Sequence, residues 1–352
     1  MIKEKIVKNT GIIYLDKKEV INALNLEMVK DIEKILKKWE NDDKIKAVLF
    51  DSLCRKGFCA GGDLKEIYED YLLNDSCKNK DEFYEEEFIL DKYVKNYKKP
   101  VFSHYFGIVM GGGIGLSINS DFIIADESVN WAMPETRLGF VPDVGVCKHI
   151  SKLPQALGQY LGLCGESLGS SDLINYNLID SYIKSEDYDK LLNILFDLSK
   201  KYEGEKLIEE FRKESEKFKN SYDSSKISKD LEKIEKYFSK PSIEEIFDNL
   251  EENKAKDEFA KNTLEILYEK SPFMLKVQFE KYFARKNLSQ DEVFDLDLKI
   301  LKYSRKNELM EEGIRSLIID KEKANWKEKS VKEVSDEKVK KILGIENLYK
   351  EK

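Results

Sequence analysis

The chain has 352 residues, of which 41% are apolar and 36% charged, and its net charge is −8. This length supports a large core, and the acidic balance excludes a typical non-specific nucleic-acid binder, which needs a basic face. The five cysteines form no CxxC pair and only two histidines are present, so we expect no metal site and no histidine-based triad. No run of 18 apolar residues occurs, so we expect no membrane span. Because no secretory signal is recognised, we expect a cytoplasmic protein.

The first half of the chain alternates strand and helix patterns. Residues 4–16 alternate in polarity around Asn9-Thr10-Gly11, which predicts a hairpin with its turn at those three residues. Asn25 is a candidate N-cap, because apolar residues follow it at helical spacing as far as Trp39. A helix is expected to begin within 111–118. Buried strands are predicted at residues 46–50, 100–106 and 121–125.

Beyond about residue 185 the pattern changes. Residues 186–260 are rich in Lys and Glu, with leucines at helical spacing between Leu191 and Leu198, and no strand pattern follows. Strands that alternate with helices indicate α/β architecture. We therefore expect an α/β core with the functional site over residues 1–185, and a helical region over residues 186–352.

Two glycine clusters follow predicted strands. The first runs from Phe58 to Asp63 (FCAGGD) and the second from Met110 to Leu116 (MGGGIGL), each directly after a predicted strand and before a helix. Glycine allows a ligand to approach the backbone closely, and a helix N-terminus has unpaired N–H groups. Two such turns could form an oxyanion hole. Tight helix packing and a phosphate cradle are the alternatives, although GxxxxGK[ST] and GxGxxG are absent.

A third segment, Trp131 to Gly145, places the acids Glu135 and Asp143 among apolar residues. Apolar surroundings raise the pKa of a carboxyl group, which suits it to general acid–base chemistry. There are simpler readings for both residues. Glu135 could cap a turn or pair with Arg137, and Asp143 could be an ordinary turn residue that follows a proline.

Taken together, AGGD, MGGGIGL and MPETRLGFVPDVG resemble, in order and spacing, the crotonase superfamily of enoyl-CoA hydratases and isomerases. The stretches at 312–315 and 319–321 (EGIR and IDK) resemble, more narrowly, its 3-hydroxyisobutyryl-CoA hydrolase branch. The resemblance covers nearly the whole chain and is weakest over about residues 190–265. It implies a core of repeated ββα units, a ββα superhelix, with a C-terminal helical region that covers the site.

The resemblance also implies roles for particular residues. The backbone N–H groups of Gly62 and Gly112 are expected to form the oxyanion hole around the thioester carbonyl. Glu135 matches the catalytic glutamate of the family, and Asp143 matches the acidic position of the hydrolase branch. The substrate is then an acyl-CoA, and no separate cofactor is expected. Further contacts with the substrate and its coenzyme A are expected from Ala60, Asp63, Lys65 and Gly111.

One position distinguishes between reactions. Hydratases of the superfamily usually have a second glutamate two residues after the glycine triplet, where this chain has Gly115. This favours hydrolysis of a short 3-hydroxyacyl-CoA thioester, as in valine catabolism. Glu135 would act as nucleophile or as the base that activates water, and Asp143 would position the water or a substrate hydroxyl. Enoyl-CoA hydration or isomerisation and non-catalytic acyl-CoA binding are the alternatives.

Two departures from the family pattern affect details. Val146 and Cys147 replace the small residues that usually follow the DVG sequence, which is expected to narrow the acyl pocket. Glu19 lies where relatives often have a basic residue near the coenzyme A phosphates. Superfamily members commonly form trimers, so a homo-oligomer remains open.

Overall fold

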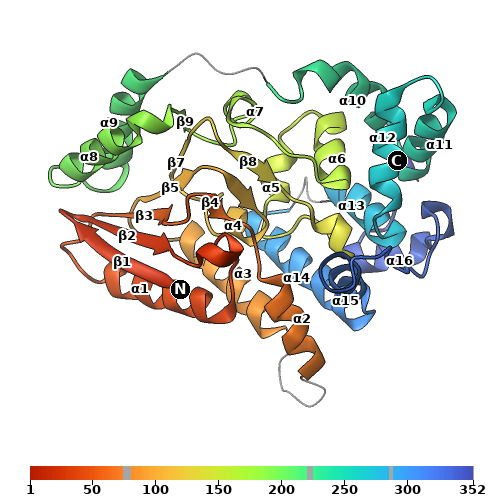
Figure 1. The fold of residues 1–352 in the computed structure, drawn as a ribbon, viewed down its shortest axis with the longest axis horizontal. Coiled ribbons are helices and arrows are strands. Elements are labelled where there is room, and N and C mark those ends of the chain that lie inside the picture. Colours follow the sequence, from red (N-terminus) through yellow and green to blue (C-terminus); the bar gives the residue numbers. More distant parts are fainter. Residues whose placement is uncertain (74–80, 220–224, 285–287, 352) are drawn as a thin grey trace. The chain divides into compact units, whose positions relative to one another are not determined.

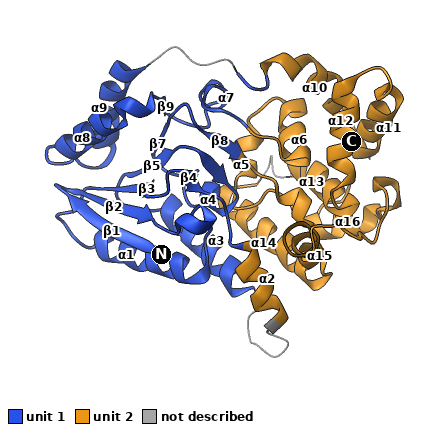
Figure 2. Ribbon diagram, in the orientation of Figure 1, with its two compact units in different colours: residues 1–63, 81–131, 168–227 blue, residues 64–80, 132–167, 228–352 orange. Residues whose placement is uncertain are grey.

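The computed structural model describes residues 1–73, 81–219, 225–284 and 288–351. These residues form two compact units that interleave along the chain (Figure 2). Unit 1 comprises residues 1–63, 81–131 and 168–227, and unit 2 comprises residues 64–80, 132–167 and 228–352. The domain division at residue 185 stays a prediction.

Unit 1 is built on two β-sheets (Figure 1). In the six-stranded sheet, with the order β1-β2-β3-β5-β7-β9, only the β1–β2 pair is antiparallel. The strands of this sheet are β1 (Ile2–Val7), β2 (Thr10–Leu15), β3 (Ala47–Ser52), β5 (Val101–Tyr105), β7 (Phe122–Ala125) and β9 (Ser181–Tyr182). The three-stranded sheet consists of β4 (Gly57–Cys59), β6 (Ile108–Met110) and β8 (Asn130–Ala132). The helices of unit 1 are α1 (Leu26–Glu40), α3 (Glu82–Lys95), α4 (Gly112–Gly115), α7 (Ser170–Asn175), α8 (Tyr188–Leu198) and α9 (Gly204–Ser215).

The strands follow one another as a repeated ββα pattern. A strand of the large sheet is followed by a short strand of the small sheet and then by a helix: β3 and β4 precede α2 (Leu64–Leu73), and β5 and β6 precede α4. In the third repeat β7 and β8 precede a 3₁₀ helix, Glu135–Leu138. The predicted crotonase-like core is therefore confirmed.

Several expected elements are present close to their predicted positions. Asn25 caps α1, because its side chain accepts a hydrogen bond of 3.0 Å from the backbone N–H of Met28. The three predicted strands correspond to β3, β5 and β7. The N-terminal hairpin also forms, but the prediction of its turn at residues 9–11 is wrong. Thr10 and Gly11 belong to β2, and the turn lies at Lys8-Asn9, where Lys8 adopts a left-handed backbone conformation with φ 55°.

The sequence predicted that the glycine clusters directly follow the strands that correspond to β3 and β5 of the large sheet, and this prediction is wrong. The clusters follow β4 and β6, the short strands of the small sheet. Each of these strands has only three residues, which is too short for a periodic pattern to show in the sequence. The small sheet therefore brings the two glycine clusters onto neighbouring strands, because β4 and β6 pair in parallel.

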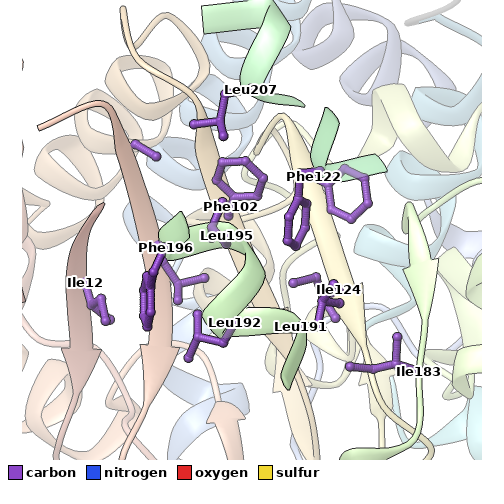
Figure 3. Close-up of a cluster of buried hydrophobic side chains, with 13 residues drawn as sticks. Ile12, Phe102, Phe122, Ile124, Ile183, Leu191, Leu192, Leu195, Phe196 and Leu207 are labelled. Atoms are coloured by element: carbon purple, nitrogen blue, oxygen red, sulfur yellow. The ribbon is translucent and has the colours of Figure 1, made fainter. Parts of the chain in front are cut away.

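Helices α8 and α9 pack on one face of the large sheet (Figure 3). Phe102 of β5, Phe122 of β7 and Phe211 of α9 form the aromatic centre of this core, with Phe211 5.1 Å from each of the other two rings. Edge-on aromatic packing of this kind adds to the stabilisation from buried apolar area. The core thus attaches the segment 188–215 to strands that precede it by about a hundred residues.

Unit 2 consists mainly of helices. From Tyr188 onward every element in the described part of the chain is helical, which confirms the predicted C-terminal helical region. None of the described helices is long and apolar enough to cross a bilayer. Cys54, Cys59, Cys147 and Cys164 are buried free thiols, whereas Cys77 lies outside the described residues. The helices of unit 2 are α2, α5 (Cys147–Ile150), α6 (Gln155–Cys164), α10 (Leu231–Phe238), α11 (Ile243–Asn253), α12 (Glu258–Tyr268), α13 (Pro272–Ala284), α14 (Gln290–Lys306), α15 (Leu309–Ile314) and α16 (Asp336–Leu343).

The aromatic core makes a prediction about stability. Replacing Phe211 by Ala leaves a cavity against Phe102 and Phe122, and we expect it to lower the free energy of unfolding by about 3–5 kcal/mol. The matched control is Ile89→Ala, because Ile89 is 51% exposed and its loss should change that free energy by no more than about 0.5 kcal/mol. Urea unfolding followed by circular dichroism measures both changes. Equal effects would contradict the account of this core.

Candidate active site

The first glycine turn leaves a backbone N–H group available at Gly62. Leu24 forms a parallel bridge with Gly62, in which Leu24 N–H donates to Gly61 O and Asp63 N–H donates to Leu24 O, both at 2.7 Å. Because the bonds on the Leu24 side are made by the flanking residues, the N–H of Gly62 points away from Leu24. This N–H donates to no backbone acceptor among the described residues.

The second glycine turn does the same at Gly112. Gly111 has φ 48°, a conformation that favours glycine, and it begins the short helix α4. Ile114 and Gly115 donate their N–H groups to Gly111 O at 2.8 and 3.1 Å. Gly112 lies in the first turn, where N–H groups have no intrahelical acceptor. Its N–H is therefore available to a ligand.

The two glycine turns lie against one another within unit 1. A Cβ atom built on Gly61 would lie 3.3 Å from Met110 O and 3.6 Å from Gly112 N, and Gly61 has φ 98°. A side chain at this position would be strained and would also crowd the second turn. Cys59 packs beneath α4, because a Cβ atom built on Gly113 would lie 2.5 Å from the Cβ atom of Cys59. Glycine is thus favoured at Gly61 by the backbone conformation and at Gly113 by the close approach of Cys59, and the two turns place two N–H donors next to each other.

The polar residues beside the first turn differ in their surroundings. Asp63 is half-buried and forms an ion pair of 2.7 Å with Lys17. Lys17 was not among the predicted site residues, although the adjacent Lys17-Lys18 pair before Glu19 was the available signal. Ala60 is half-buried, and its N–H donates to Ile21 O at 3.0 Å. In unit 2, Lys65 is 70% exposed and lies 3.8 Å from Glu69, a spacing that leaves its ammonium accessible to an anion.

Glu135 is the first residue of the 3₁₀ helix 135–138 and is buried in unit 2. Pro134 precedes this helix, and Gly139, with φ 67°, ends it. Burial raises the pKa of the Glu135 carboxyl group well above its ordinary value, and the charge of Asp143 raises it further. Oε2 of Glu135 accepts no hydrogen bond from any described residue. Arg137 pairs instead with Glu269, at 3.2 Å, so the simpler pairing with Glu135 is not found.

Asp143 is also buried and is electrostatically linked to Glu135. Burial and then the charge of Asp297 raise the pKa of Asp143 to about 8, although Lys281 opposes the shift. A carboxyl group with this pKa retains its proton at neutral pH. The two groups therefore titrate as a pair that keeps at least one proton at neutral pH, and ionisation of one of them would give the acid and the base that acid–base chemistry requires. An ordinary turn aspartate would be exposed and ionised.

Cys147 and Gly115 relate to two further expectations, the width of the acyl pocket and the missing second glutamate. Cys147 is buried, and its thiol faces Pro142 O at 3.4 Å, so it packs against the turn that carries Asp143. Whether Val146 and Cys147 narrow an acyl pocket stays a prediction. Gly115 is fully enclosed in α4 and supplies no carboxyl group at the position where hydratases have their second glutamate.

Both histidines lie in structural surroundings. Nδ1 of His104 is 3.1 Å from Asp51, and the ring stacks on Tyr188 with centroids 3.5 Å apart. Burial lowers the pKa of His149 to about 4, with a further contribution from Lys152. The described residues contain no cluster of three or more His, Cys, Asp or Glu side chains that could hold a metal ion.

Comparisons with known proteins identify the family. The sequence matches the enoyl-CoA hydratase/isomerase family over residues 10–343. The mitochondrial 3-hydroxyisobutyryl-CoA hydrolase of Xenopus laevis is 32% identical over 330 residues, with 93% of this chain and 84% of that protein covered. The human protein of the same name is 32% identical over 333 residues, with the same coverage.

Solved structures agree with this assignment. An enoyl-CoA hydratase from Rhodobacter sphaeroides 2.4.1 superposes with a TM-score of 0.84 at 26% identity, with 98% of this chain and 97% of that chain covered. A carnitinyl-CoA dehydratase from Mycobacterium thermoresistibile has the same fold, with a TM-score of 0.84 at 24% identity and with 97% and 96% of the two chains covered. The glycine turns, the ββα repeats and these matches together show that the chain belongs to the enoyl-CoA hydratase/isomerase family, the crotonase superfamily.

Proposed function

We propose that the protein hydrolyses a short 3-hydroxyacyl-CoA thioester, such as 3-hydroxyisobutyryl-CoA, to the free acid and coenzyme A, as in valine catabolism. The observation that carries this proposal is the buried, mutually interacting carboxyl pair Glu135 and Asp143. The absence of a carboxyl group at Gly115 supports hydrolysis over hydration. The curated relatives that cover most of the chain have names that support the same reaction.

The two carboxyl groups have separate roles in the proton transfers of thioester hydrolysis. Glu135, in its ionised form, attacks the thioester carbonyl or removes a proton from an attacking water. Asp143, in its protonated form, donates its proton to the thiolate that leaves, either directly or through a substrate hydroxyl and a chain of water molecules. Both roles require that the two carboxyl groups differ in protonation, and burial together with the shared charge makes double ionisation costly.

Two routes use these groups. In the first, Glu135 becomes acylated and forms a mixed anhydride, which water then cleaves. In the second, Glu135 takes a proton from water, and the water oxygen attacks directly. Single turnover in ¹⁸O-water detects the anhydride route when water attacks the glutamyl carbonyl of the anhydride, because only then does ¹⁸O enter the carboxyl group of Glu135.

The backbone N–H groups of Gly62 and Gly112 are our candidates for stabilising the oxyanion that forms on the carbonyl. Donors of this kind are typically worth about 10²–10³ in rate each. Ala60, Asp63, Lys65 and Gly111 are our candidates for contacts with the substrate and its coenzyme A moiety. Lys17 forms an ion pair with Asp63. We therefore add Lys17 as a candidate for the basic group near the coenzyme A phosphates, which Glu19 cannot supply. The cytoplasm remains our proposed compartment.

The substrate assay uses the purified protein with 3-hydroxyisobutyryl-CoA and with crotonyl-CoA. We expect release of free thiol from the hydroxyacyl substrate and no loss of the enoyl absorbance of crotonyl-CoA, because one of the two hydratase carboxyl groups is missing at Gly115. Free thiol is measured with a disulfide reagent, and the enoyl group by its ultraviolet absorbance. Hydration of crotonyl-CoA without thiol release would overturn the hydrolase proposal.

Substitution of Glu135 by Gln tests the catalytic assignment. We expect thiol release to fall by about 10²–10⁴-fold, the typical contribution of a positioned acid or base, while acyl-CoA affinity stays within a few-fold of wild type. Glu269→Gln is the matched control, since Glu269 is an exposed glutamate that pairs with Arg137. Stopped-flow thiol detection and calorimetric titration give the two quantities. Retained turnover in Glu135→Gln would remove Glu135 from the mechanism.

A further inference from the structure

An ion pair lies completely buried behind the turn that carries Asp143. Lys281 of α13 pairs with Asp297 of α14, and neither side chain has any exposed surface. Lys281 Nζ also donates to Pro142 O at 2.5 Å, and Gly145 N–H donates to Asp297 Oδ2 at 3.0 Å. The two members of the ion pair therefore hold the residues on either side of Asp143, within unit 2.

The turn from 142 to 145 has a backbone that needs such support. Val144 has φ 48°, a left-handed conformation that β-branched residues rarely adopt, and Gly145 has φ 71°. Gln290 of α14 adds a third bond, because its Nε2 donates to Gly145 O at 3.0 Å. A Cβ on Gly145 would lie 2.4 Å from that nitrogen. The conformation of the turn is thus imposed by α13 and α14.

A buried ion pair is a costly way to stabilise a fold. Removing two charges from water costs about as much as their attraction returns, and apolar side chains of similar volume often stabilise a protein as well or better. The Lys281–Asp297 pair also interacts electrostatically with other titratable groups. Asp297 of α14 and Lys281 of α13 act on the carboxyl group of Asp143. Asp143, Lys281 and Lys270 act on the carboxyl group of Glu135, and Cys147 of α5 acts on Lys281.

We propose that Lys281 and Asp297 are positioning residues for Asp143: they fix the 142–145 turn, and with it the direction of the Asp143 carboxyl group, for the reaction. This inference rests on the proposed function for its kinetic consequences, but the locked turn itself does not depend on it. We expect neither residue to touch the substrate, because both side chains are fully buried. Their effect on turnover passes through the position and charge of Asp143.

A matched pair on the same helix provides the control. Lys276 of α13 is also buried, with 3% exposure, and forms an ion pair of 2.6 Å with Glu244. Its other contacts are with Val334 O and Asp336, and none of its bonds within the described part of the chain goes to the 142–145 turn. Loss of this pair reports the general cost of removing a buried lysine from α13.

The experiment replaces each pair by apolar residues, so that no buried charge is left alone. We expect the double variant Lys281→Met/Asp297→Leu to fold with a thermal midpoint close to that of Lys276→Met/Glu244→Leu. With 3-hydroxyisobutyryl-CoA its kcat should fall by about 10²-fold, because misplacement of about 1 Å costs that much, while KM changes little. The control variant should keep both constants. Equal kcat values for the two double variants would overturn the proposal.

A charge change at one position provides a second readout that a merely structural role would not move. In Asp297→Asn the positive charge of Lys281 remains and the negative charge that raises the pKa of Asp143 is gone, so that pKa falls. The alkaline limb of the kcat/KM profile should then move to lower pH. Lys281→Met removes the opposing positive charge and should not move it in that direction. Identical profiles for wild type and Asp297→Asn would contradict the proposal.

Hydrogen exchange at Gly145 separates this inference from the hydrolase proposal. Its N–H is bonded to Asp297, so exchange should be faster by about tenfold or more in Lys281→Met/Asp297→Leu than in the control double variant. If wild type releases no thiol and this acceleration is still found, the hydrolase proposal fails and the locked turn stands. If Gly145 keeps its wild-type protection, the locked turn fails, whatever the reaction.

Discussion

Two carboxyl groups, those of Glu135 and Asp143, are buried near one another in an interior that also contains Asp297. A low-dielectric interior accepts an isolated charge only at a large cost, and two like charges at a larger one. The protein meets this constraint by raising the pKa of both groups, so that a proton stays on the pair at neutral pH. Lys281 balances Asp297 and limits the shift. The chemistry that we propose uses this arrangement: the proton retained on the pair serves as the acid, and the carboxyl group that ionises serves as the base.

The glycine turns follow from a different constraint, namely the approach of two backbones. The small sheet aligns β4 with β6, and each strand leads into a turn with an available N–H group, at Gly62 and at Gly112. A side chain at Gly61 would be strained by its φ of 98° and would crowd Met110 O of the second turn, 3.3 Å from its Cβ. A backbone donor does not titrate and needs no rotamer to be fixed, so its position depends only on the sheet. Electrostatic stabilisation by such preorganised donors is commonly the largest single contribution to acyl transfer.

Motif content predicted more of this protein than periodicity did. The glycine clusters and the PET segment indicated the fold and the family, and the N-cap at Asn25 was recognised from local chemistry. The strands β4, β6 and β8 were missed because three residues carry no period. The Lys281–Asp297 pair could not be predicted either. Both residues appear in the sequence as ordinary members of charged helices, and only the tertiary structure brings them to the 142–145 turn.

The protonation state of Asp143 decides whether the carboxyl pair can act as we propose. Infrared difference spectra between wild type and Asp143→Asn report the carboxyl C=O stretch of this one residue over a range of pH. We expect a protonated Asp143 at pH 7, whose band disappears as the pH rises through about 8, because burial and then the charge of Asp297 raise its pKa. An Asp143 that is already ionised at pH 6 would contradict this assignment, since Asp143 would then hold no proton to donate to the leaving thiolate.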